Sequence, residues 1–260
     1  MTVEDALRAA RDSGRKLLVP YLTGGLGGQW TRYVEVVAAA GADAIEIGIP
    51  FSDPVMDGPT IQEASEQALR VGATPVSILD ELRTVEAGVP LVAMTYYNVV
   101  FRTGHRRFAN LLVEAGVGGV ILPDVPLEEL ADWRRAGEQA GIETVLLASP
   151  VTPDDRLAAI CEQAQGFVYV VSLMGVTGER RHLAGSAVVL AKRVKTITDK
   201  PVLVGVGVST PEQAAEAAAV ADGVIVGSAL MRRILDGAGT EAVADFIRSF
   251  RAALDLGSSP

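Results

Sequence analysis

Short apolar runs alternate with longer amphipathic stretches along the whole chain. Eight of these runs are rich in β-branched residues, and several are apolar almost throughout, which is typical of parallel strands buried on both faces. We predict strands at Leu17–Thr23, Ala44–Gly48, Leu91–Thr95, Gly119–Leu122, Thr144–Ala148, Phe167–Val171, Val202–Val206 and Gly223–Val226.

The stretches between the predicted strands are rich in alanine and carry apolar residues at helical spacing. They predict helices that include Trp30–Ala40, Phe108–Ala115, Leu127–Ala140, Pro153–Gln163, Ala187–Thr198 and Pro211–Val220. Gly41, Gly116 and Gly141 stand where three such helices would end, each directly before the next strand. The chain is therefore an alternation of strand and helix.

Eight strand–helix units in 260 residues match the number and size of a (β/α)8 barrel, the TIM barrel. We expect one such barrel domain over residues 1–260. A doubly wound open sheet generally has fewer strands, and the glycine-rich turn Thr23–Gly28 lacks the G-x-G-x-x-G spacing of a dinucleotide site. In TIM barrels the functional residues follow the carboxyl ends of the strands, and phosphate is often held after strands 7 and 8.

Charge and composition exclude several classes of protein. The net charge is −9 without any long cluster of Lys and Arg, which disfavours nucleic-acid binding. No apolar run has the length of a membrane span, and the start of the chain is too charged for a signal peptide or membrane anchor. The single cysteine, Cys161, excludes an internal disulfide and fits a reducing cytoplasm; we expect it to be a small buried residue on a helix.

One carboxylate lies inside a predicted strand. Glu46 is flanked by two isoleucines, and the loop after its strand contains three prolines and a second carboxylate, Asp57. Apolar surroundings raise the pKa of a carboxyl group, so Glu46 is suited both to give and to take a proton. Asp57, in a polar turn, should stay ionised and could stabilise positive charge. Alternatively, hydroxyl groups satisfy a purely structural Glu46, and Asp57 is a turn former.

The last two units carry a second signal. Gly205 and Gly207 follow the seventh strand, and Gly227–Ser228 follow the eighth. Ser228 is predicted to cap a short helix over 229–232, whose first backbone N–H groups would form a phosphate site. Alternatively, these glycines only form tight turns and Ser228 is only a cap.

Two other chemistries for a carbon–carbon lyase are disfavoured by the residues present. A Schiff-base enzyme needs a lysine at a strand end, and none of the four lysines, Lys16, Lys192, Lys195 and Lys200, is expected there. A zinc site needs several converging ligands, whereas the chain has only two histidines, His105 and His182, in separate loops. A lyase on this scaffold would have to use plain acid–base catalysis.

From its first strand to its last helix, the chain resembles the alpha subunit of tryptophan synthase. The motifs that carry the resemblance are E-I-G-I-P-F-S-D-P from Glu46, D-G-P-T from Asp57, L-P-D-V-P from Leu122, G-V-T-G from Gly175, G-V-G-V-S from Gly205 and G-S-A from Gly227. Two positions depart from the pattern of many relatives, Met56 and Leu173, and both lie on loops expected to close over the site.

The resemblance implies retro-aldol cleavage of indole-3-glycerol phosphate to indole and glyceraldehyde 3-phosphate, in tryptophan biosynthesis. Glu46 would be the general acid and base, and Asp57 would hold the indole N–H. Tyr169 would lie beside the reacting atoms, and Tyr21 and Met94 would line the indole pocket. The remaining substrate-binding residues, mostly around the phosphate, would be Thr177, Gly178, Gly207, Gly227 and Ser228.

The resemblance also implies a partner. Indole would pass to a beta subunit in an α2β2 assembly, and pyridoxal phosphate would be bound there, with neither a metal nor an organic cofactor in this chain. Three alternatives remain open: a stand-alone lyase that releases free indole, a non-catalytic subunit that only activates a beta partner, and another phosphate-handling barrel such as an isomerase.

Overall fold

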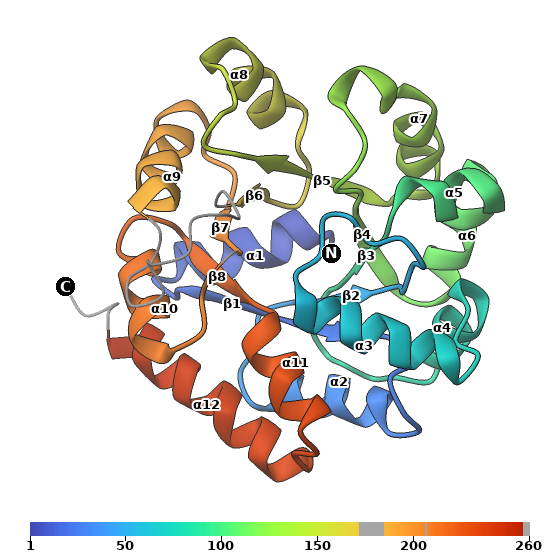
Figure 1. Cartoon of the computed structure of the whole chain (residues 1–260). Helices are drawn as coiled ribbons and strands as arrows, with labels where there is room; N and C mark the ends of the chain where they lie inside the picture. The colour runs from blue at the N-terminus through green and yellow to red at the C-terminus, as the bar shows by residue number, and fades with distance from the viewer. Residues whose placement is uncertain (172–184, 206, 257–260) are drawn as a thin grey trace.

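Eight parallel strands close into a barrel in the order of the chain, with helices around the outside (Figure 1). The computed structural model describes residues 1–171, 185–205 and 207–256. The strands are β1 Leu17–Thr23, β2 Ile45–Gly48, β3 Leu91–Met94, β4 Val117–Ile121, β5 Glu143–Ala148, β6 Val168–Val170, β7 Val202–Val204 and β8 Gly223–Val226. The predicted (β/α)8 fold is confirmed.

Helices follow every strand and include several that the sequence analysis did not specify. They are α1 Val3–Asp12, α2 Trp30–Ala39, α3 Pro59–Arg70, α4 Pro75–Leu82, α5 Tyr97–Thr103, α6 His105–Glu114, α7 Ala131–Ala140, α8 Asp154–Gln163, α9 Gly185–Ile197, α10 Pro211–Ala218, α11 Ser228–Leu235 and α12 Thr240–Leu256. Within the described ranges, none of the helices combines the length and hydrophobicity that crossing a membrane requires.

Local chemistry explains where helices begin and end. The predicted helix Leu127–Ala140 is divided, because Pro126 opens a short 3-10 turn, η1 Leu127–Glu129, before α7 begins. Gly41, Gly116 and Gly141 follow α2, α6 and α7 with φ values of 110°, 72° and 77°, as predicted for glycines that end helices. Cys161 is buried on α8, also as predicted.

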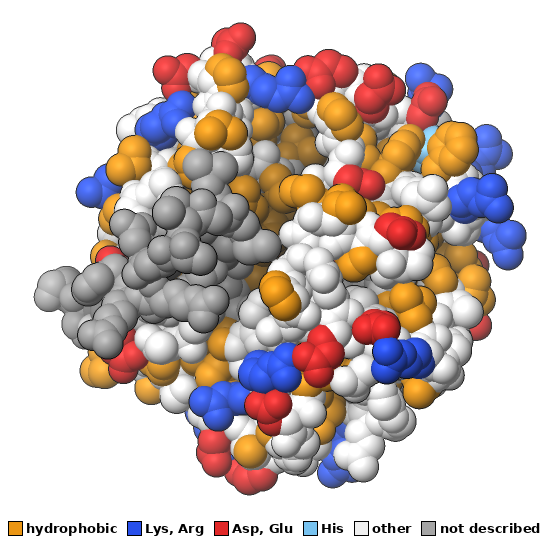
Figure 2. Space-filling view, viewed as in Figure 1, with side chains coloured by type: hydrophobic (Ala, Val, Ile, Leu, Met, Phe, Trp, Pro, Cys, Tyr) orange, Lys and Arg blue, Asp and Glu red, His pale blue; other side chains and the backbone are white. Residues whose placement is uncertain are grey.

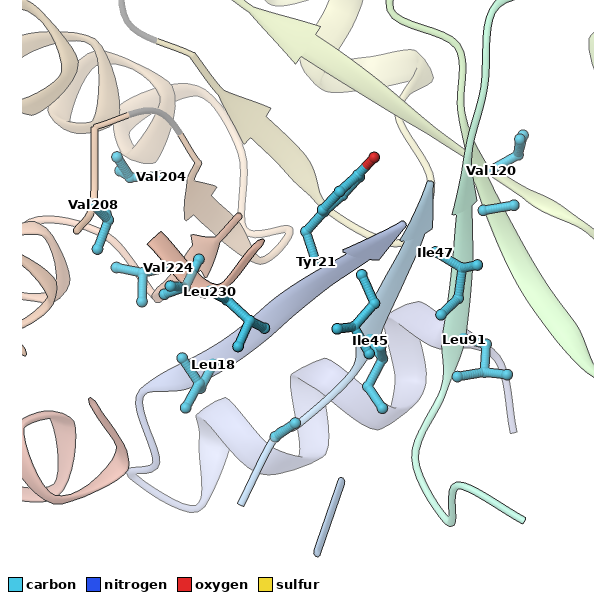
Figure 3. Packing of buried hydrophobic residues seen from close by; sticks show 14 of the residues in the cluster. Leu18, Tyr21, Ile45, Ile47, Leu91, Val120, Val204, Val208, Val224 and Leu230 are labelled. Carbon is cyan, nitrogen blue, oxygen red and sulfur yellow. The ribbon is translucent and has the colours of Figure 1, made fainter. Parts of the chain in front are cut away.

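Alternation along the strands separates two apolar layers. On β1, Leu17 and Val19 belong to the cluster inside the barrel, whereas Leu18 packs with the cluster beneath the helices. Tyr21 belongs to the same cluster as Leu18 but projects from β1 on the opposite side (Figure 3). This alternation directs Tyr21 to the interior and places its ring near the carboxyl end of the strand.

The amino-terminal helix closes the end of the barrel at which the strands begin, here called the lower end. A capping box formed by Thr2 and Asp5 starts α1, and its residues Val3 and Leu7 pack into the inner cluster. The backbone N–H of Glu4 donates to the Glu143 carboxylate on β5 at 3.0 Å. With this end filled, the site must lie at the opposite end of the barrel.

A buried carboxylate ties together three segments at the lower end. Asp43, just before β2, accepts hydrogen bonds from the Leu18 backbone N–H at 2.8 Å and from Arg15 at 2.5 Å. Its other contact is an ion pair with Arg251 of α12 at 3.1 Å, and both side chains are less than a tenth exposed. Removal of Asp43 would leave the Arg251 charge buried without this partner.

Arg251 keeps its ion pair with Asp255 at 2.8 Å, so we expect Asp43→Ala to lower the free energy of unfolding by about 3 kcal/mol, the lower end of the cost of breaking a buried pair. The measurement is urea denaturation. The matched control is Asp199→Ala, whose side chain is 82% exposed in its pair with Arg8, so its removal should cost far less stability. Equal losses in the two variants would contradict the role given to Asp43.

Candidate active site

Glu46 lies on the inner wall of the barrel, where β2 aligns it with Tyr21 on β1 and Val92 on β3. Its side chain is buried, with the residue only 1% exposed. Within the part of the chain that the structure describes, its Oε2 has no hydrogen-bond partner and no cation pairs with it. These residues therefore do not form the alternative arrangement, in which neighbouring hydroxyls would satisfy the whole Glu46 carboxyl group.

Burial raises the pKa of Glu46 to about 8, and the nearby negative charge of Asp57 adds to this effect. The raised pKa predicted from the apolar neighbours is thus present. At neutral pH the Glu46 carboxyl is mainly protonated, so it can act as an acid and, once it has given up its proton, as a base.

Asp57 is less exposed than a polar turn predicts. The loop 50–59 folds inward at this point, and burial raises the pKa of Asp57 to about 6. A hydrogen-bonding contact with the Tyr96 phenol lowers the pKa and partly opposes the burial. Asp57 remains mainly ionised at neutral pH, as expected, but closer to its titration than an exposed aspartate.

Tyr96 is a site residue that the sequence analysis did not select. Its phenol oxygen accepts a hydrogen bond from the Met56 backbone N–H at 2.9 Å, and its ring stacks on Phe51 with centroids 5.2 Å apart. Tyr96 is only 4% exposed and stands just after β3, between Met94 and α5. Its position could have indicated it, because an aromatic residue with a hydroxyl group directly after a strand end is placed to reach the site.

Two further tyrosines fill the inner wall beside Glu46. Tyr21 and Tyr169 are 6% and 7% exposed, and burial raises the pKa of both phenols, which therefore stay neutral. Each ring lies over a glycine at the carboxyl end of a neighbouring strand: Gly48 is the last residue of β2, and Gly205 directly follows β7. A Cβ on Gly48 would lie 1.9 Å from the Tyr21 hydroxyl, and one on Gly205 would lie 1.8 Å from the Tyr169 ring. These glycines make room for the tyrosines.

Thus Glu46, Asp57, Tyr21 and Tyr169 lie within electrostatic reach of one another. Met94 is partly buried at the end of β3, in contact with both apolar layers. The structure brings these five predicted residues into one wall at the carboxyl ends of the strands.

The start of α11 borders the same wall. A Cβ on Gly227 would be 3.5 Å from the Tyr21 Cβ, so this helix end is close to the carboxylate site. The N-cap is Gly227, without a side-chain cap, and Ser228 is the first helical residue; the prediction of Ser228 as N-cap is wrong. The glycine leaves the first N–H groups of α11 without a capping side chain, which favours an anion there.

Gly207 is exposed with a φ of 88°, a conformation that favours glycine. Val206, beside it, lies outside the described residues. Thr177, Gly178, Leu173 and His182 also fall in the stretch 172–184, which the structure does not describe, so their predicted roles stay predictions.

Three of the lysines have partners away from Glu46. Lys16 donates to the Ala221 carbonyl at 3.1 Å, and Lys195 pairs with Asp222 at 2.9 Å. Lys200 donates to carbonyl groups at the end of α8. No group of three or more His, Cys, Asp or Glu residues is arranged to hold a metal ion in residues 1–171, 185–205 or 207–256.

Comparison with known proteins gives a consistent picture. A family model described as tryptophan synthase alpha chain matches residues 7–252. A tryptophan synthase alpha chain from Streptomyces coelicolor is 46% identical over 98% of this chain and 96% of its own length. One from Thermobifida fusca is 41% identical over 96% of this chain and 95% of its own.

Solved structures agree. A structure of Mycobacterium tuberculosis tryptophan synthase superposes with a TM-score of 0.89 at 38% identity, covering 97% of each chain. A tryptophan synthase alpha chain from Legionella pneumophila has a TM-score of 0.89 at 33% identity, covering 98% of each chain.

The raised pKa of Glu46 predicts that stability depends on pH. The folded state holds the Glu46 proton more tightly than the unfolded state. The stabilisation that this proton gives is therefore full below pH 4.5 and is lost as pH rises toward about 8. Relative to Glu46→Gln, the free energy of unfolding of the wild type should fall by up to about 1.4 kcal/mol per pH unit in that window. Urea denaturation of both proteins at several pH values measures this difference.

The matched control is Glu86→Gln, at an exposed position. A difference between wild type and Glu46→Gln that stays constant from pH 4.5 to 8 would contradict the burial of an unpaired Glu46 carboxyl.

Proposed function

Since the chain belongs to the tryptophan synthase alpha chain family, we propose that it cleaves indole-3-glycerol phosphate to indole and glyceraldehyde 3-phosphate. The observation that carries the proposal is the buried carboxyl group of Glu46, whose Oε2 has no partner among the described residues, close to Asp57 and to the two phenols. The chain would act as a lyase in tryptophan biosynthesis, in the cytoplasm.

The first step is proton transfer from Glu46 to C3 of the indole ring. The ring carbon becomes tetrahedral and positive charge develops toward the ring nitrogen. The Asp57 carboxylate accepts a hydrogen bond from the indole N–H and stabilises that charge, an effect that is strong where water is excluded. Burial of Glu46 supports this step, because a carboxyl group with a pKa of about 8 still carries its proton at neutral pH.

The second step breaks the carbon–carbon bond. The Glu46 carboxylate removes the proton of the side-chain hydroxyl, the C3 bond to that carbon breaks, and its electron pair returns to the ring, which restores neutral indole. The hydroxyl carbon becomes the aldehyde of glyceraldehyde 3-phosphate, and Glu46 is again protonated. This cycle uses acid–base chemistry alone, and the three lysines with carbonyl or carboxylate partners are not needed in it.

The substrate phosphate would bind at the amino-terminal end of α11. The N–H groups after Gly227 are free of a side-chain cap, and no acidic residue stands in the first turn to repel an anion. Because Gly227 lies against Tyr21, a phosphate there places the indole end of the substrate toward Glu46. Gly207, Ser228, Thr177 and Gly178 stay proposed phosphate or loop contacts.

A beta subunit that holds pyridoxal phosphate is the proposed partner, in an α2β2 assembly. Large apolar side chains are exposed on loops and helices that follow the strand ends: Val55 is 81% exposed, Met56 51%, Phe101 66% and Val151 68%. Figure 2 shows hydrophobic side chains around the hollow at the centre of this face. Exposed apolar surface of this kind supports docking of another protein over the site.

The alternatives receive less support. No observation favours a lyase that works without a beta subunit. The match to the tryptophan synthase alpha chain family disfavours an isomerase. A non-catalytic activator would not need the buried and unpaired carboxyl of Glu46, which costs stability.

The direct test incubates the purified chain with indole-3-glycerol phosphate, with and without a beta subunit, and measures indole. We expect indole in both cases, and Glu46→Gln should lower kcat by about two to four orders of magnitude, the usual scale for loss of an acid–base group. Near-normal turnover by Glu46→Gln would refute its role, and a wild type that makes no indole would refute the function.

The pH dependence of kcat/KM should be bell-shaped. The acid limb, near pH 6, reports Asp57, which must be ionised; the basic limb, near pH 8, reports Glu46, which must be protonated. Because the two carboxyls interact, the limbs belong to the pair. Asp57→Asn should remove the acid limb. Steady-state kinetics from pH 5 to 9 provide the measurement, and an activity that keeps rising above pH 8 would contradict Glu46 as the acid.

A further inference from the structure

The loop 50–59 that carries Asp57 has few contacts of its own to hold it in place. Its internal hydrogen bonds are short-range turns, from the Val55 N–H to the Asp53 carbonyl at 2.9 Å and from the Asp57 N–H to the Pro54 carbonyl at 3.1 Å. Val55 and Met56 are more than half exposed. Such a segment depends on neighbouring elements to fix its conformation.

Tyr96 makes three contacts with this loop. Its ring stacks on Phe51, its phenol oxygen accepts the Met56 N–H at 2.9 Å, and its phenol group lies near enough to the Asp57 carboxylate to lower the pKa of Asp57. The contacts fall at the beginning and near the end of the loop. One side chain therefore spans the segment, while the Gln62 side chain of α3 adds a hydrogen bond to the Asp57 carbonyl at 2.8 Å.

Tyr96 itself is held firmly. The preceding residue, Thr95, donates its backbone N–H to Ile121 of β4 at 3.1 Å, and the N–H of Tyr97 donates to the Asp124 carboxylate at 2.9 Å. The Tyr96 residue is 4% exposed and forms the N-cap of α5. The loop is thus attached to a fixed point of the barrel wall.

We propose that Tyr96 is a positioning residue that holds the Asp57 loop in its site-forming conformation within the chain itself, before any partner binds. From the sequence, the loop that carries Met56 is expected only to close over the site; the contacts of Tyr96 organise it already in the isolated subunit. The catalytic consequence rests on the proposed function, whereas the conformational consequence does not.

The phenol hydroxyl is what the proposal depends on. Its oxygen accepts from the Met56 N–H at 2.9 Å, and the same hydroxyl group interacts with the nearby Asp57 carboxylate. Tyr96→Phe keeps the ring and its stacking on Phe51 but loses both interactions. Tyr33→Phe is the matched control. Tyr33 lies on α2, and its phenol donates one hydrogen bond to the Ala238 carbonyl at 2.9 Å, which the variant loses.

The first experiment is amide hydrogen exchange of the isolated chain, read on peptides that cover residues 51–58. In the wild type the Met56 N–H should be protected by its bond to Tyr96. In Tyr96→Phe we expect exchange to be about tenfold faster there, the scale for loss of one hydrogen bond. In Tyr33→Phe exchange should match the wild type, with the strands protected in all three proteins. Equal exchange of these peptides in wild type and Tyr96→Phe would overturn the proposal.

The second experiment measures turnover of indole-3-glycerol phosphate by the isolated proteins. Tyr96→Phe should lower kcat about tenfold, the equivalent of about 1.4 kcal/mol, with KM changed less than twofold because the proposed phosphate contacts are untouched. A normal kcat overturns the proposal. Absence of turnover by the wild type instead refutes the proposed function, and hydrogen exchange then decides the role of Tyr96 alone.

Discussion

The site depends on one constraint, the burial of a carboxyl group without a cationic partner. Glu46 stands on a strand whose neighbours are apolar on both sides, and its Oε2 has no hydrogen-bond partner among the residues that the structure describes. An arginine at hydrogen-bonding distance would lower the pKa of Glu46 and abolish its use as an acid at neutral pH. The same feature that destabilises the folded chain at high pH therefore supplies its proton.

The rest of the wall excludes water from the Glu46 carboxyl group. Tyr21 and Tyr169 cover it with rings that fit only because Gly48 and Gly205 lack side chains. Glycine weakens strands, so the fold accepts a cost at two positions to seat two phenols beside the carboxyl. Stability is provided elsewhere, by the apolar clusters, by α1 beneath the barrel and by the buried Asp43 pair with Arg251.

Most of the fold could be predicted from the sequence, because buried parallel strands are apolar along their whole length; β1 and β8 match their predicted bounds. The raised pKa of Glu46 also followed from its apolar neighbours. Contacts between distant segments could not be predicted. Tyr96 reaches the loop across 40 positions, which no local pattern indicates. Ser228 is a favoured N-cap residue, yet the backbone places Gly227 at that position.

The two carboxylates differ in how they are held, and this difference determines where regulation can act. Glu46 lies in a strand paired on both sides, so a partner that docks on the barrel face can hardly move it. Asp57 lies on a loop that is held by hydrogen bonds with Tyr96 and Gln62, next to exposed Val55 and Met56. A protein that covers those two side chains presses on the segment that carries Asp57. Coupling between partner and chemistry should therefore act through the charge-stabilising carboxylate and leave the proton donor unchanged.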